Sequence, residues 1–223
     1  MNALVDRESL ALGACYALVH AQNLLDDAAS LYSRKRASGA LHLAVMAREE
    51  LGRFILLGRR YSELPTGGSV DAREFARSLQ PHKVKLQAGQ SAVPVPMTSE
   101  QLAEWTAAIQ NNDESKLAAI SADVRSRAEK LRPHQAAEWH QRRLKAQYVD
   151  LDPQTGLWSK PSDVSMLDAE SLIRTVVAEI ANALITSQGV AWIHSAFERA
   201  GIAFPRMGPF THQIYGQLAA PDA

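Results

Sequence analysis

The sequence predicts an all-α protein, an antiparallel helical bundle, and three observations support that prediction. The chain is rich in alanine and leucine, and 46% of its residues are hydrophobic but only 6% aromatic, which favours helix over sheet. Apolar residues recur at helical spacing over long stretches. A length of 223 residues suits a single domain. We therefore expect one helical domain over 1–223, ending in an irregular apolar tail at 201–223.

The first half of the chain predicts three helices with short connections. Residues 7–33 carry apolar side chains at helical spacing, and Gly39 suggests a tight connection to a second helix at about 40–61. Helices joined by so short a link are expected to pack as antiparallel neighbours. A third helix begins at Asp71, a typical N-cap residue, and Pro81 kinks or restarts it.

Prolines interrupt the middle of the chain. The segment 91–97 contains two prolines and is expected to be an extended linker, followed by a helix. Two further helices are expected at 113–131 and 134–147, because Pro133 lies between them and a proline breaks helical hydrogen bonding.

The periodicity changes again near residue 147. Residues 147–160 alternate briefly, turn at a DPQTG sequence and resume, which predicts a small hairpin or extended excursion. Asp168 is expected to cap a last long helix at about 169–200, and Gly201 to end it.

Composition also limits the location and the partners. Lys plus Arg and Asp plus Glu number 24 each, so bulk charge does not indicate nucleic-acid binding and any basic site must be local. Cys15 is the single cysteine, which excludes an intrachain disulfide and favours a reducing cytoplasm. The N-terminal residues do not resemble a signal peptide, and no apolar run is long enough for a membrane span. We expect a cytoplasmic protein without a membrane partner.

The stretch AVMAREELGRFIL, at 44–56, places charges within an apolar helical pattern. Glu49 and Glu50 both lie one helical turn from Arg53, so intrahelical surface salt bridges are one interpretation. Because charges amid apolar neighbours are costly unless paired, the alternative is a buried network between the first two helices. Its expected members are Asp27, Glu49, Glu50 and Arg53.

A second constellation is PHKVK, which sets His82, Lys83 and Lys85 together, with Arg77 five residues before the histidine. His82 and Lys85 share one helical face. The group is either a basic solvated surface or a site for an anionic substrate.

Motifs for metals and cofactors are missing from the sequence. There is no histidine pair at i, i+4, no second cysteine, and no Glu-x-x-His motif of the di-iron bundles. A phosphate-binding loop and a nucleophile elbow are also missing. We therefore expect no metal and no cofactor.

Three blocks of the sequence resemble the AbiV group of abortive-infection proteins within the HEPN superfamily. They are HAQNLLDDAASLY, ASGALHLAVMAREELGRFILL and KAQYVDLDPQTGLWSKP, and together they span about 16–161. The middle block is the most specific. His20 and Arg53 depart from the residues usual in the family, Asn and Lys, but both keep polar character.

The resemblance implies a nuclease site in which an arginine precedes a histidine by four to six intervening residues. Four pairs fit that spacing: Arg36–His42, Arg77–His82, Arg127–His134 and Arg206–His212. Arg77–His82 is preferred because Lys83 and Lys85 are close by. The implied catalytic residues are His82, Arg77, Glu49 and Arg53, and the implied substrate-binding residues are Lys85, Lys83, Glu50 and Asp27.

The implied activity is metal-independent RNA cleavage in anti-phage defence, at a site formed by a homodimer. His82 would exchange a proton with the 2′-hydroxyl or the leaving oxygen, and nearby cations would stabilise the phosphorane. Two alternatives stay open. One is a non-catalytic interaction protein that blocks translation by binding a partner, and the other is a toxin held inactive by a second protein.

Overall fold

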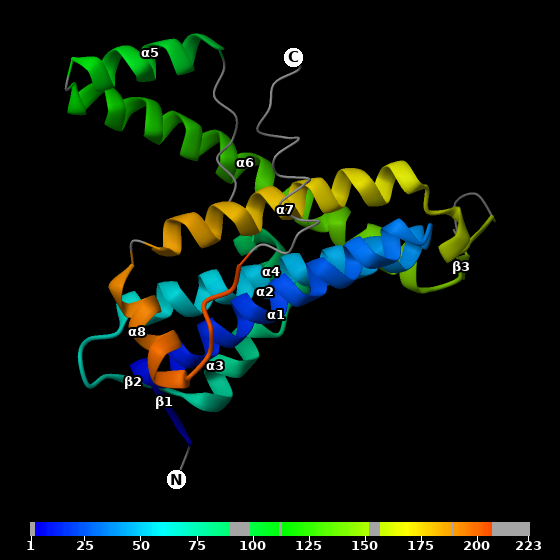
Figure 1. Cartoon of the computed structure of the whole chain (residues 1–223), viewed down its shortest axis with the longest axis horizontal. Helices are drawn as coiled ribbons and strands as arrows, with labels where there is room; N and C mark the ends of the chain where they lie inside the picture. Colours follow the sequence, from blue (N-terminus) through cyan, green and yellow to red (C-terminus); the bar gives the residue numbers. More distant parts are fainter. Residues whose placement is uncertain (1–2, 90–98, 112, 152–156, 189, 207–223) are drawn as a thin grey trace.

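The structure is a computed structural model that describes residues 3–89, 99–111, 113–151, 157–188 and 190–206. Its architecture is the predicted helical bundle. The long helices α1 (Arg7–Ser33) and α2 (Ala37–Glu63) pack against each other as an antiparallel pair, as expected (Figure 1). Alanines and leucines of both helices form the centre of the core, which α7 (Met166–Gln188) completes.

The connection between α1 and α2 lies earlier than predicted. It comprises residues 34–36, with Lys35 in the left-handed conformation at φ 59°. Gly39 is inside α2, where a Cβ atom would lie 3.0 Å from Leu31 Cδ1. Gly39 therefore allows close packing of α2 against α1. The sequence correctly indicated that the two helices are close together here, but Gly39 is not part of the turn that connects them.

Two short strands that the sequence pattern did not reveal lie at the end of the α1–α2 pair where α1 begins and α2 ends. β1 (Leu4–Asp6) pairs antiparallel with β2 (Ser69–Asp71), and Val5 lies opposite Val70. Each strand leads into a capped helix. Asp71 caps α3 (Ala72–Leu79) by accepting a hydrogen bond from the Glu74 amide at 2.9 Å, as predicted. Pro81 then separates α3 from α4 (His82–Gly89).

The prediction of two helices around Pro133 is wrong. After α5 (Ser99–Gln110), a single helix α6 runs from Glu114 to Gln147. A proline removes only one donor from the helical ladder, and here both halves of α6 are supported, by α5 at one end and by α2 and α4 at the other. In Figure 1, α5 and the first part of α6 project from the bundle as an arm. The expected linker at 91–97 lies outside the described residues.

The predicted hairpin is present. β3 (Asp150–Leu151) pairs antiparallel with β4 (Trp158–Ser159), and the short 3₁₀ turn η2 (Pro161–Asp163) leads to α7.

The prediction of one long last helix is wrong, because α7 and α8 (Ala191–Ala200) meet at an angle of 95°. Asp168 lies in the first turn of α7 and bonds to Ser165, whose hydroxyl oxygen accepts from the Asp168 amide at 3.0 Å. Gly201, at φ 65°, ends α8 as predicted. The tail beyond Arg206 lies outside the described residues.

No single helix in the described ranges has both the length and the apolar character needed to cross a bilayer. Helices α7 and α8 meet that criterion only together, as a bent pair.

Candidate active site

Helix α4 lies on α2 at a contact that only glycine permits. A Cβ atom on Gly52 would lie 1.8 Å from the carbonyl oxygen of Lys85, and one on Gly89 would lie 2.8 Å from the carbonyl oxygen of Arg48. Both distances are far below van der Waals contact. The two backbones therefore touch directly, which holds the side chains of His82 and Lys85 over the middle of α2.

Glu49 lies at the centre of the resulting site. Its side chain is only 6% exposed and meets groups from two other helices. The Oε2 atom lies 2.7 Å from His82 Nδ1 and 3.7 Å from Lys85 Nζ, both on α4. The Oε1 atom lies 3.8 Å from Arg143 Nε on α6.

A second histidine from α6 completes this group. The imidazole rings of His140 and His82 stack with their centroids 5.8 Å apart and their planes inclined by 22°. We call the five residues Glu49, His82, Lys85, His140 and Arg143 the Glu49 cluster. Lys85 is buried, whereas the side chain of His82 is 44% exposed and accessible to a ligand.

The electrostatic environment of the Glu49 cluster favours an anion. One carboxylate faces two basic side chains, Lys85 and Arg143. Burial lowers the pKa of His140, and Arg143, His82 and Lys83 lower this pKa further, against the opposite effect of Glu49. The nearby imidazole of His42 also has a lowered pKa, because of burial and then Arg143.

Several polar atoms of this region lack a hydrogen-bond partner within the described part of the chain. They are Glu49 Oε1, Arg143 Nε, His42 Nδ1 and His140 Nδ1, and all four are buried. Buried polar atoms are normally paired, and an unpaired one is costly. Two of these atoms, Glu49 Oε1 and Arg143 Nε, face each other at 3.8 Å, beyond hydrogen-bonding distance.

A buried ion pair lies next to the Glu49 cluster. The guanidinium of Arg48 on α2 contacts the carboxylate of Glu179 on α7, and both side chains are almost completely buried. The guanidinium carbon also lies 3.6 Å from the centre of the Trp139 ring on α6. Burial raises the pKa of Glu179 to about 7, an effect that Arg48 only partly offsets. Arg48 therefore links α2 to both α7 and α6, next to the site.

The expected network of Asp27, Glu49, Glu50 and Arg53 does not form. Asp27 is exposed on α1. Arg53 is 39% exposed and pairs with Glu50 within α2 at 2.9 Å, so these two residues form the ordinary surface salt bridge. Glu49 alone is buried, and its partners come from α4 and α6 instead of α1.

The other predicted residues fall into two groups. Lys85 joins the Glu49 cluster, and Lys83 is exposed beside it, close enough to act on His140. Arg77 is exposed in the last turn of α3, and within the described residues no hydrogen bond or ion pair joins its side chain to His82 or Glu49. Arg143 supplies the guanidinium at the place where Arg77 was expected.

The remaining Arg–His pairs gain no support as sites. Arg36 is exposed just before α2 begins, whereas His42 is half-buried. The side chains of Arg127 and His134, and residue His212, lie outside what the structure describes.

Sequence reasoning missed four residues of this region: Arg48, Trp139, His140 and Arg143. Three of them lie in the stretch WHQRR, whose run of aromatic and basic residues was the available signal. Arg48 stands inside the charged stretch of α2, directly beside Glu49.

Across the described ranges, no three His, Cys, Asp or Glu side chains come together in a way that could hold a metal ion.

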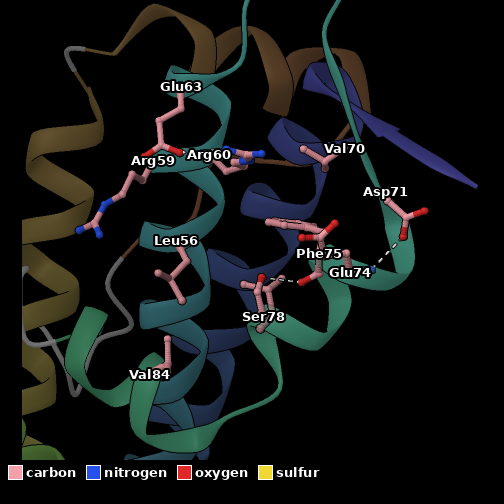
Figure 2. Close-up of a pocket in the computed structure, with 11 residues that line it drawn as sticks. Leu56, Arg59, Arg60, Glu63, Val70, Asp71, Glu74, Phe75, Ser78 and Val84 are labelled. Atoms are coloured by element: carbon pink, nitrogen blue, oxygen red, sulfur yellow. Dashed lines mark hydrogen bonds and ion pairs between the residues drawn. The ribbon is translucent and has the colours of Figure 1, made fainter.

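A cavity of about 600 Å³ lies elsewhere, between α2, β2, α3 and α4 (Figure 2). Three of its charged side chains are engaged locally, since Arg60 pairs with Glu63 at 3.3 Å and Asp71 caps α3. None of its lining residues belongs to the Glu49 cluster. The Glu49 cluster is therefore the stronger candidate for chemistry.

Replacing Gly52 with alanine is expected to push α4 away from α2 and to break the contact between His82 and Glu49. The added Cβ meets backbone, which cannot rotate away, so we expect a loss of about 1–3 kcal/mol or more in the free energy of unfolding. Urea unfolding measures this loss. Gly13→Ala on α1 is the matched control, because its Cβ would lie at an ordinary 3.5 Å from Leu57. Equal stability of the two variants would contradict the packing argument.

Acidification is expected to destabilise the fold through His42. Its pKa is lower in the folded protein than the ordinary value of 6.5, so below that pH the unfolded chain binds more protons than the folded chain. The contribution to stability is therefore present above pH 6.5 and lost as the pH falls. Urea unfolding midpoints at about pH 7.5 and about pH 5.5 measure the change. His42→Gln should lose less stability than wild type over this interval, and an equal loss would refute the assignment.

Fold and site together define an all-α bundle of the HEPN type with a histidine–carboxylate pair among cations. The sequence profile of a HEPN family described as AbiV matches residues 10–182. That range is more than half of the chain, and the protein therefore belongs to the AbiV family of HEPN proteins. No curated protein and no solved structure gives a significant match.

Proposed function

We propose that this AbiV-family protein is an effector of abortive infection that cleaves RNA without a metal ion. The observation that supports the proposal best is the hydrogen bond of 2.7 Å between His82 and the buried carboxylate of Glu49, surrounded by Lys85 and Arg143. A half-exposed imidazole oriented by a carboxylate is suited to proton transfer, and the adjacent cations are suited to a phosphate.

In this proposal the reaction is attack of a ribose 2′-hydroxyl on the adjacent phosphorus. Glu49 is a positioning residue: it holds His82 Nδ1 and thereby leaves Nε2 of the same ring for the substrate. His82 exchanges a proton with the attacking or the leaving oxygen. Lys85 and Arg143 stabilise the additional negative charge of the phosphorane.

RNA incubation tests the proposal directly. The purified protein is incubated with a mixture of cellular RNAs, with and without EDTA. We expect cleavage in both reactions, and products that end in a 2′,3′-cyclic phosphate, since the 2′-oxygen is the nucleophile. Cleavage that EDTA abolishes, or products with 3′-hydroxyl ends, would refute the proposed chemistry.

A non-catalytic function is the second candidate. The arm of α5 and the first part of α6 projects from the bundle, and Ile109 on α5 is 53% exposed, which suits contact with another protein. The net charge of zero also gives no general attraction to RNA. In this alternative the protein blocks translation by binding a partner, or is a toxin held inactive by an antitoxin. An absence of RNA cleavage by the wild-type protein would favour it.

We also propose that the protein acts in the cytoplasm as a homodimer. HEPN nuclease sites commonly form at a two-fold interface, and family membership extends that expectation to this chain. Multi-angle light scattering at tens of micromolar should give about twice the protomer mass of 24.4 kDa. A single-protomer mass would contradict the dimer.

A further inference from the structure

We infer that His140 is a second catalytic histidine, acting as the general base toward the 2′-hydroxyl while His82 acts as the general acid toward the 5′-oxygen. This inference rests on the proposed ribonuclease activity and assigns roles that the proposal leaves open. Its basis is the stacking of His140 on α6 with His82 on α4, whose ring centroids lie 5.8 Å apart. His82 in turn contacts the Glu49 carboxylate.

The spacing of the rings suits a two-proton reaction. Attack and departure take place on opposite sides of phosphorus, so the base and the acid must reach different oxygens of one phosphodiester. Each nitrogen must approach its oxygen within about 2.6–3.2 Å. Two rings 5.8 Å apart are close enough to serve the same phosphate and far enough apart to reach different oxygens.

The two imidazole rings have different neighbours. His82 Nδ1 contacts the Glu49 carboxylate, which stabilises the positive charge of an imidazolium. His140 faces Arg143 from its own helix and His82 and Lys83 from α4, and Glu49 on α2 is the only anion among these neighbours. Burial and the neighbouring basic groups disfavour a positive charge on His140, so the pKa of His140 lies below its usual range. A lowered pKa suits His140 to the role of the base, and the contact with Glu49 positions His82 as its partner in the reaction.

The step balances without any co-reactant. The 2′-hydroxyl proton moves to neutral His140 as the bond between 2′-oxygen and phosphorus forms. The bond between phosphorus and the 5′-oxygen breaks, and the 5′-oxygen takes the proton of the His82 imidazolium. The products are a 2′,3′-cyclic phosphate and a 5′-hydroxyl, and a proton exchange with water restores both histidines.

A pair of RNA substrates tests the assignment. One is an ordinary dinucleotide, and the other carries sulfur in place of the bridging 5′-oxygen, which gives a thiolate leaving group that needs no proton. His140→Gln should slow cleavage of both substrates by about 10²–10⁴. His82→Ala should slow the ordinary substrate by a similar factor but cleave the sulfur substrate at nearly the wild-type rate. His20→Ala, on an exposed histidine of α1, is the control and should cleave both normally.

The outcomes separate the inference from the proposed function. If His140→Gln cleaves both substrates at the wild-type rate, this inference fails while the ribonuclease proposal stands. If the sulfur substrate rescues His140→Gln instead of His82→Ala, the two roles are reversed and the assignment is wrong. If wild-type protein cleaves neither substrate, the proposed function itself fails. NMR titration of the wild-type imidazoles is independent of variant folding, and a His140 ring that titrates above 6.5 would also refute the assignment.

Discussion

His82→Ala protein is expected to keep its fold and to cleave RNA about 10²–10⁴-fold more slowly than wild type. His82 is 44% exposed, so its removal leaves no large cavity in the core. The substitution does remove the imidazole that the buried Glu49 carboxylate positions at 2.7 Å. Initial rates on a fluorogenic RNA measure the effect, and circular dichroism and urea unfolding verify the fold.

Two further variants make this prediction specific. Glu49→Gln keeps the shape of the positioning residue but removes its charge. This variant should cleave RNA more slowly than wild type, although His82 is still present. Arg77→Ala, which the sequence alone placed in the site, should now have little effect, because Arg77 is exposed and Arg143 lies beside Glu49. Undiminished cleavage by His82→Ala would place the chemistry at another histidine.

Glu179→Ala is expected to reduce the free energy of unfolding by about 3–5 kcal/mol. The substitution leaves the guanidinium of Arg48 buried without its carboxylate, and two nitrogens of this guanidinium, Nε and Nη1, already lack hydrogen-bond partners in the described part of the chain. A loss of this size is comparable to a substantial part of the stability of a typical domain. Urea unfolding at fixed pH measures it.

A double variant is the matched control for the buried pair. Arg48→Met combined with Glu179→Leu removes both charges and retains much of the volume, so it should be far more stable than either single variant and close to wild type. The Met side chain also keeps an apolar contact for the Trp139 ring. If the single and double variants lose stability additively, the two charges do not interact and the prediction is wrong.

Local signals in the sequence were sufficient for most helix boundaries. The helix expected at 7–33 is observed as Arg7–Ser33, and the one expected from Asp71 is observed with Asp71 as its cap. Apolar periodicity and capping are properties of neighbouring residues, so they can be recognised without the rest of the fold. The same reasoning identified the hairpin of β3 and β4.

The wrong predictions concern places where distant contacts outweigh local preference. Pro133 was expected to end a helix, but α6 continues because its two halves pack against different helices. The helix expected at 169–200 instead bends by 95° between α7 and α8. The pairing of β1 with β2 joins segments more than 60 residues apart and has almost no local signal.

For the site, the sequence by itself determined the residue types and the helices that carry them: a charged stretch on one helix that includes Glu49, and a basic stretch with His82 and Lys85 on another. Only the tertiary structure decided their partners. The close contact at Gly52 places α4 on α2. Helix α6 adds Arg143 and His140, which follow α4 by about 60 residues in the sequence. Spacing along a helix defines which residues share a face, but it does not define which helix covers that face. That choice depends on the packing of the whole core, which buried Glu49 and Arg48 and left Asp27 and Arg77 exposed.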